Sequence, residues 1–147
     1  MYTLNEIVKK LEDLQIASAL LGSGSFLFGD PWEYGASNPI QYPLVGARLI
    51  SSPVNDKTLT VNINLFFCDK VLKDESNETE VLSNMMLAAL RFYSELRLNL
   101  ENNSITDPAM LSITANLTPF TEKFDDEVSG HEMTIAIEQF FDKSTCS

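Results

Sequence analysis

The sequence predicts a single α+β domain over residues 1–147, with two helices packed on one face of a mainly antiparallel sheet of about five strands. Three observations lead to this fold class. Two stretches place apolar residues at three- and four-residue steps, other stretches alternate apolar with polar residues, and short connections join successive strands as in hairpins. The predicted order of elements along the chain is α-β-β-β-α-β-β.

The first predicted helix occupies residues 1–22. Thr3 and Glu6 have the spacing of a capping box, in which each side chain bonds a backbone N–H left free at a helix start. Gly22 and the glycine at position 24 end the helix. One apolar stripe follows from the spacing of Leu4, Ile7, Val8, Leu11, Leu14, Ala17 and Leu21.

Residues 26–68 are predicted to hold three strands. Phe26 to Phe28 is a short apolar run, and the aromatic loop 29–39 follows it, rich in Gly and Pro. Residues 40–50 are expected to form an edge strand, because Pro43 lacks a backbone donor and Gly46 suggests a bulge.

After a turn over residues 51–56, residues 57–68 give the clearest strand signal. Its buried face is predicted from the alternating residues Leu59, Val61, Ile63, Leu65 and Phe67. The opposite face is expected to be mostly polar and uncharged, and so either solvated or in contact with another subunit. At roughly 3.4 Å per residue the strand would extend about 40 Å, far beyond an average strand.

A long helix is predicted over residues 77–101, and a hairpin follows over residues 111–141. Asn77 and Glu80 offer a second capping box. The broad apolar face of the helix consists of Val81, Leu82, Met85, Met86, Ala89, Leu90, Tyr93, Leu96 and Leu100. In the hairpin, an acidic turn over 122–130 separates a strand beginning at Leu111 from one over 133–140, and residues 142–147 form a polar tail.

The composition excludes several classes of protein. The 147 residues include 21 acidic and 10 basic ones, a net charge of -11, which opposes binding to nucleic acid phosphates. The apolar runs are far shorter than the roughly 20 residues that cross a bilayer, so we expect no membrane segment. Lys9 and Lys10 interrupt the apolar stretch that a targeting signal needs. Cys68 and Cys146 are expected to be free thiols.

No catalytic, cofactor or metal site is predicted. His131 is the single histidine and no serine has the signature of a nucleophile, so we interpret His131 as a structural or solvated residue. The acidic cluster Asp125 to Glu127 matches no calcium loop and is interpreted as a solvated tip. Trp32 and Tyr34 have two open interpretations: they anchor an interface, or they fold back over the sheet edge.

Four segments carry a resemblance that covers most of the chain from Leu4 to Phe141. They are Phe28-Gly29-Asp30-Pro31-Trp32-Glu33, Ile40-Gln41-Tyr42-Pro43-Leu44, Val61-Asn62-Ile63-Asn64-Leu65-Phe66-Phe67-Cys68-Asp69 and Lys73-Asp74-Glu75-Ser76-Asn77-Glu78. The chain resembles the tail terminator and neck (head-tail connector) ring proteins of tailed bacteriophages. The last two segments look similar to virion proteins of Bacteroides-infecting and crAss-like gut phages.

The resemblance implies a non-enzymatic, structural virion subunit, assembled in the bacterial host cytoplasm. It implies a homo-oligomeric ring on the order of six or twelve copies. Such a ring would contact neck, portal-side or tail-tube proteins, and DNA would pass through its lumen without specific binding. Ring contacts are expected from the hairpin 112–141 and the strand 57–68.

Residues were assigned to these contacts by type. The expected interface residues are Trp32, Tyr34, Tyr42, Phe66, Phe120, Phe124 and Phe140, and the expected lumen residues are Glu122, Asp125, Asp126 and Glu127. The alternative hypothesis is a small non-enzymatic binding module in which Trp32, Tyr34 and Tyr42 hold a peptide or a sugar.

Overall fold

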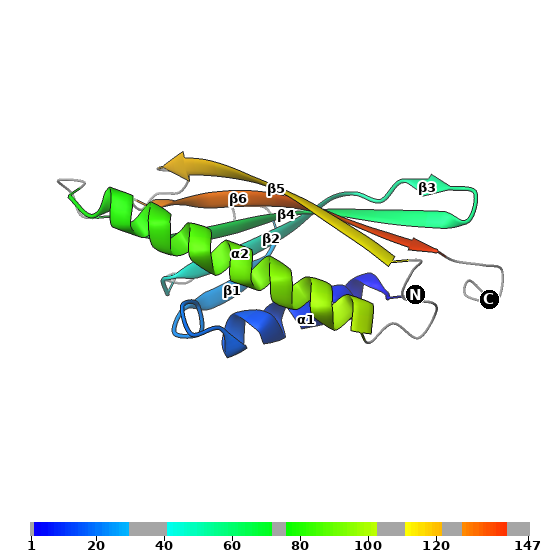
Figure 1. Ribbon diagram of the computed structural model, residues 1–147, viewed down its shortest axis with the longest axis horizontal. Helices are drawn as coiled ribbons and strands as arrows, with labels where there is room; N and C mark the ends of the chain where they lie inside the picture. The colour runs from blue at the N-terminus through cyan, green and yellow to red at the C-terminus, as the bar shows by residue number, and fades with distance from the viewer. Residues whose placement is uncertain (1, 30–40, 72–75, 103–110, 122–127, 141–147) are drawn as a thin grey trace.

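A computed structural model describes residues 2–29, 41–71, 76–102, 111–121 and 128–140 of the chain, and it has the predicted α+β class (Figure 1). Two helices and six strands lie in these ranges. They are α1 (Leu4–Ala17), β1 (Ser25–Phe28), β2 (Leu44–Ser51), β3 (Val54–Asn55), β4 (Thr58–Lys70), α2 (Glu78–Asn102), β5 (Leu111–Thr121) and β6 (Val128–Phe140).

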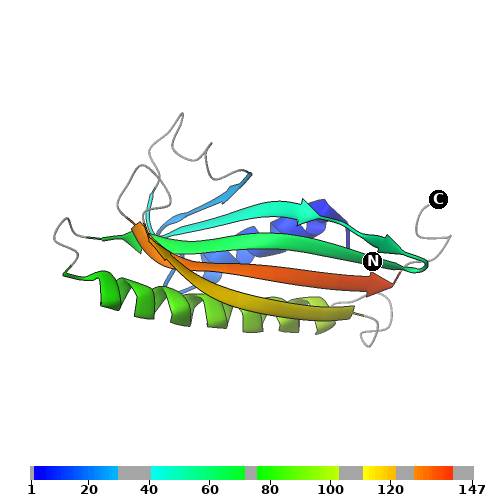
Figure 2. The same cartoon turned by 90° about the horizontal axis from the view of Figure 1, so that it is seen from above.

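The sheet is open and has the strand order β1-β2-β4-β6-β5, with β3 paired to β4 beside this path. All pairs are antiparallel except β1 with β2, which is parallel. Both helices cover the same face of the sheet, and no helix of the described ranges lies on the other face (Figures 1 and 2). The predicted two-layer arrangement of helices on one face is therefore confirmed.

Three strand predictions need correction. The bulge expected at Gly46 lies between Leu49 and Ser51, and Gly46 itself pairs regularly with Phe66. The segment expected to be a turn contains β3, which pairs with β4 through a tight hairpin in which Asp56 has a positive φ of 42°. The count is therefore six rather than five. The strand expected at an edge is β2, which lies between β1 and β4, and Pro43 precedes its first residue and removes no bond from the pairing of β2.

The first helix begins as predicted and ends earlier. Thr3 and Glu6 form the capping box, with Glu6 N–H donating to Thr3 Oγ1 and Thr3 N–H donating to Glu6 Oε1. The helix ends at Ala17 rather than near residue 22, because Ser18 adopts extended backbone with ψ of 131°. The Gln15 side chain then bonds the carbonyl of Leu21 at 2.7 Å and holds the following turn.

The core lies between the helices and the sheet. β4 contributes its predicted apolar face, and α2 packs on it with a continuous buried stripe. Phe67 of β4 and Phe92 of α2 meet edge to face, with ring centroids 5.1 Å apart. The fully buried apolar residues of this layer include Ile7, Leu11, Leu21, Ala47, Ile63, Leu65, Ala89, Leu96, Leu100, Ile135 and Ile137.

The helix-free face is only partly as predicted. Toward the start of β4 the side chains are polar, whereas Cys68 at the other end is buried in a second apolar cluster with Leu44 and Val128. Phe66 is also buried, and its ring meets that of Phe120, which packs against this cluster. Val128 belongs to β6 because the strand begins there, five residues before the predicted start. The second half of β4 is consequently buried on both faces.

Candidate functional site

The expected aromatic contact residues separate into two groups. Tyr42 and Phe120 are half-buried and pack against the second apolar cluster, and Phe66 is buried with its ring 6.2 Å from that of Phe120. Lys70 Nζ lies 5.4 Å from the centroid of the Tyr42 ring. Phe66 therefore belongs to the interior of the subunit and offers no exposed contact surface.

The remaining predicted contacts lie outside the described residues. This holds for Trp32, Tyr34 and Phe124, for the side chain of Phe140, and for the acidic residues Glu122, Asp125, Asp126 and Glu127. Their assignments to an interface and to a lumen therefore stay predictions.

His131 is a structural residue, in agreement with one of the two predicted roles. Its side chain is 3% exposed, on the face of β6 that α2 covers, and its Nε2 lies 2.9 Å from the carbonyl oxygen of Leu82. Nδ1 has no hydrogen-bond partner in the described part of the chain. Ser129 Oγ lies 3.5 Å from Glu78 Oε1 nearby, at the limit of a hydrogen bond.

Cys68 is a free thiol, as predicted, and it is fully buried. Burial raises the pKa of its thiol far above the ordinary value, and the neighbouring Asp69 carboxylate acts in the same direction. Because the thiolate is the reactive form, the Cys68 side chain acts as a small apolar core residue rather than as a nucleophile.

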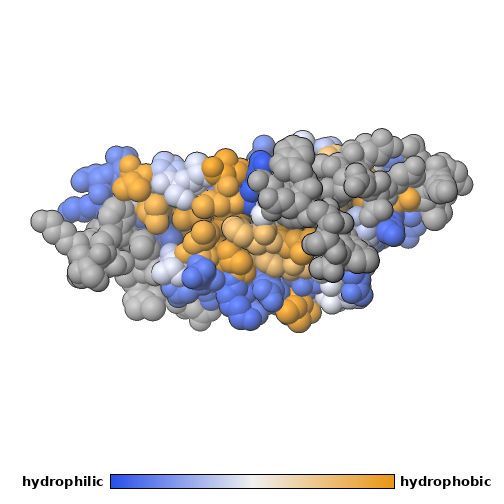
Figure 3. Space-filling model, turned by 180° about the vertical axis from the view of Figure 1, so that it is seen from behind, coloured by the Kyte–Doolittle hydropathy of each residue, from blue (hydrophilic) through white to orange (hydrophobic). Residues whose placement is uncertain are grey.

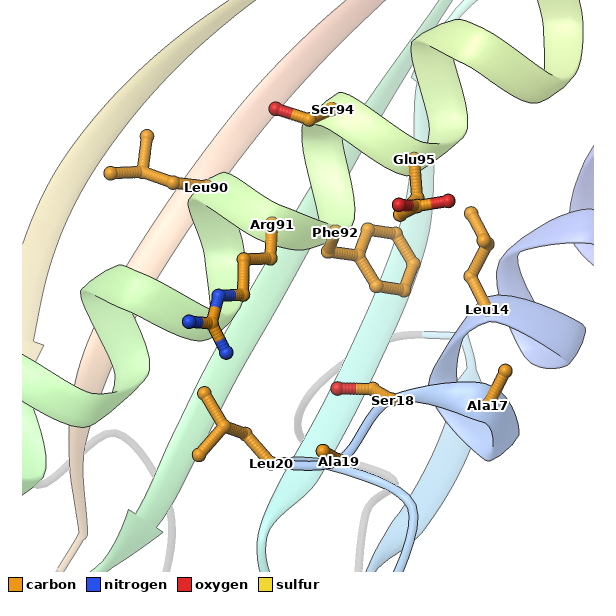
Figure 4. Close-up of a pocket in the computed structure, with 10 residues that line it drawn as sticks. All are labelled: Leu14, Ala17, Ser18, Ala19, Leu20, Leu90, Arg91, Phe92, Ser94 and Glu95. Atoms are coloured by element: carbon orange, nitrogen blue, oxygen red, sulfur yellow. The ribbon is translucent and has the colours of Figure 1, made fainter.

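A cavity of about 650 Å³ opens between the end of α1 and the middle of α2 (Figure 4). Phe92 and Leu14 form an apolar wall, and Leu20 lies across from Arg91. Glu95 projects from α2 one turn beyond Arg91, so the rim carries both charges. The size is that of a small-molecule pocket, but its wide mouth and mixed rim define no particular ligand.

β5 forms one edge of the sheet, and among the described strands it pairs only with β6. It has 11 residues, none of which is charged, and Thr114, Ala115 and Asn116 at its centre are exposed. Edge strands of monomeric proteins are usually short or protected by charged side chains, because their free N–H and C=O groups invite another strand. β5 has neither of these protections, and Pro119, which has no N–H to donate, is its one edge-protecting residue. The sequence pattern alone did not show that β5 would be an edge.

An apolar strip on α2 adjoins this edge. Met86 is 45% exposed and Leu90 is 51% exposed. Figure 4 shows Leu90 pointing away from α1, toward the side on which β5 runs. We call β5 with these two α2 residues the front surface, because β5 and α2 are the elements in front in Figure 1.

A second set of exposed apolar side chains lies on the opposite side of the molecule. Phe28 of β1 is 43% exposed, and Leu49 and Ile50 of β2 are 36% and 48% exposed. Figure 3 shows apolar residues gathered at the centre of this side. We call the exposed part of β1 and β2 the back surface, so the two surfaces face away from each other.

No group of three or more acidic, histidine or cysteine side chains that could hold a metal ion occurs among the described residues. In the same ranges, no helix is long and apolar enough to cross a membrane. The chain matches no model of a known protein family and no curated protein at a significant level. The front and back surfaces are the features of the described residues that bear most directly on function.

Proposed function

We propose that this chain is a non-enzymatic structural subunit of a bacteriophage virion, which assembles into a ring at the neck or tail end. In this role the ring joins head and tail, and DNA passes through its lumen. The proposal combines the resemblance to tail terminator and neck ring proteins with the arrangement of the exposed apolar surfaces.

The observation that carries the proposal is the opposite placement of the front and back surfaces. Leu90 on the front and Ile50 on the back are each about half exposed. Burying such exposed apolar side chains against a partner is energetically favourable. Two different surfaces that face away from each other favour head-to-tail contacts between copies. Such contacts are heterologous and close into a ring when the rotation per copy allows it.

The charge distribution supports a passage for DNA. Residues 101–147 hold nine acidic and two basic residues, a net charge of -7. Residues 1–100 hold twelve acidic and eight basic residues, a net charge of -4. A negative wall repels a polyanion and lets it slide without binding. A ring whose carboxy-terminal segments face the lumen would therefore favour transit of DNA.

The proposal is tested by the oligomeric state of the full chain. Native mass spectrometry and electron microscopy over a series of concentrations are expected to show one closed oligomer, on the order of six or twelve copies. The ring should also bind phage head or tail preparations. A chain that stays monomeric at every concentration, alone and with these preparations, would contradict the proposal.

A second candidate function is a binding module, which the cavity between α1 and α2 favours. Phe92 and Leu14 in its wall provide apolar contact, and Arg91 and Glu95 provide polar contacts for a peptide or a sugar. Calorimetric titration of peptides and sugars into the parent protein and into Arg91→Ala separates the two functions. Weaker binding in the variant, with its assembly unchanged, supports the module, and a ring that binds none of these ligands supports the structural role.

A further inference from the structure

We propose that β5 of one copy pairs edge to edge with β1 of the next copy, so that one antiparallel sheet continues from subunit to subunit. This inference rests on the proposed ring and specifies its contact. It identifies the partner of the open β5 edge as a second copy of this chain.

The open edge of β5 is complementary to another strand. Between Thr114 and Pro119 the strand bonds only to β6, so its outer backbone groups have no partner within the described residues. Water can hydrate such groups, but among protein partners an extended backbone matches a row of N–H and C=O groups best. A partner helix or loop would meet few of them.

β1 is the strand at the other edge of the sheet, and some of its backbone groups point outward, where they can pair with β5 of another copy. Ser25 N–H donates to Pro43 O at 3.1 Å, and Gly29 N–H donates to Ala47 O at 2.8 Å. The backbone N–H groups of the odd-numbered residues Ser25 and Gly29 therefore point toward β2. Because backbone groups alternate along a strand, the N–H and C=O groups of Phe26 and Phe28 point away from β2. They lie where another strand would bind.

The strand directions make this contact antiparallel. β1 runs parallel to β2, and three antiparallel steps lead from β2 through β4 and β6 to β5. β5 and β1 therefore run in opposite directions. Copies related by a rotation about an axis along the strands keep these directions, so β5 meets the next β1 in the antiparallel, slightly more stable arrangement.

The charge distribution permits a second copy as the occupant. Two chains with a net charge of -11 repel each other, and this repulsion is smallest where uncharged surfaces meet, as β5 and β1 do because both lack charged residues. Pairing of β5 with another β5 would be neutral too, but it would leave Phe28 and Leu49 exposed in every copy. Pairing of β5 with β1 covers the front and back surfaces together.

Cysteine cross-linking tests this contact in the full chain. The background variant carries Cys68→Ala and Cys146→Ser, and the test variant adds Ala115→Cys on β5 and Phe28→Cys on β1. Both positions are exposed and lie on the helix-covered face, since Phe28 pairs with Ala47 and Ala115 with Ile135. A short bis-maleimide is expected to produce a ladder of covalent multimers that reaches the size of the ring.

The control is Glu95→Cys with Phe28→Cys, in which the α2 cysteine lies beside the cavity and away from β5. It should give no ladder. Pro119→Cys with Phe28→Cys is run in parallel, because it samples a register shifted along β5. Native mass spectra of each variant before cross-linking establish that it still assembles.

The outcomes separate this inference from the proposed ring. Rings that assemble without a ladder from either β5 cysteine would overturn the β5–β1 contact and leave the ring intact. Covalent dimers from Ala115→Cys alone would show pairing of β5 with β5 and would also overturn it. If the unmodified chain never assembles, the proposed function itself fails.

Discussion

The main chain of Tyr2 and the side-chain amide of Gln139 exchange two buried hydrogen bonds. Tyr2 N–H donates to Gln139 Oε1 at 2.7 Å, and Gln139 Nε2 donates to Tyr2 O at 3.2 Å. Tyr2 also donates its hydroxyl proton to Leu100 O at 3.1 Å. Tyr2 thus connects the residues before α1 to the end of β6 through Gln139 and to the last turns of α2 through Leu100.

The change Gln139→Leu should lower the free energy of unfolding by about 2–4 kcal/mol. It keeps the approximate volume but leaves the Tyr2 N–H and C=O groups buried without partners. Urea denaturation followed by circular dichroism measures the loss. The matched control, Tyr2→Phe, removes only the bond to Leu100 and should cost about 1 kcal/mol; equal losses in the two variants would contradict the double hydrogen bond.

The change Gly130→Ala should destabilise the fold by at least about 3 kcal/mol. A Cβ at position 130 would overlap the backbone of Phe67 and Cys68, which the neighbouring strand cannot move aside. The readout is the melting temperature of the purified variant. Glu138→Ala, on an exposed position of the same strand, is the control and should change stability by less than about 0.5 kcal/mol.

The Cys68 thiol should be unreactive toward a maleimide in the native protein and react fully after denaturation. Its burial excludes the reagent and raises the pKa of the thiol, so the thiolate is absent. Mass spectrometry of labelled peptides separates Cys68 from Cys146. Rapid labelling of Cys68 under native conditions would contradict its place in the second apolar cluster.

The same pKa shift predicts a pH dependence. The raised pKa keeps Cys68 protonated in the folded state, while the unfolded thiol ionises near its ordinary value of 9.0. The stabilisation is complete below that value and decreases as pH rises above it. The slope of unfolding free energy against pH above 9 should therefore be smaller in Cys68→Ala, and identical slopes would contradict the shift.

The change Thr3→Ala should lower stability by about 1 kcal/mol, because the side chain of Thr3 caps α1.

The capping box also predicts an acid dependence of stability. The pKa of Glu6 is lowered mainly by the hydrogen bond from the Thr3 backbone and, to a smaller extent, by that from the Thr3 side chain. Because its pKa is lowered in the folded protein, Glu6 stabilises the fold at pH values above its ordinary pKa. This stabilisation is lost as the pH falls through the pKa that Glu6 has in the folded protein. Glu6→Gln should therefore show a weaker acid dependence than the parent protein in thermal melts at pH 2 to 6, roughly the range in which Glu titrates.

Local patterns determined the helices, most strands and the fold class. The Thr3 and Glu6 pair gave the start of α1, and the alternation in β4 gave its helix-covered side. The three- and four-residue spacing gave only part of the buried face of α2. Met86 and Leu90, which were expected on that face, are exposed, and Phe92, which was not, is buried in the core. These features depend on residues within one or two turns, or on neighbours along one strand, so the sequence displays them directly. The free thiol at Cys68 also followed from the sequence.

Tertiary structure alone decided how the elements meet. β5 is an exposed edge because β6 inserts between it and β4, and β2 is internal because β1 adds beside it in parallel. The burial of Phe66 and the clamp between Tyr2 and Gln139 likewise depend on residues distant in sequence. A periodic pattern specifies which face of a strand is buried and leaves its neighbours open, since many pairings bury the same face and long-range contacts choose among them.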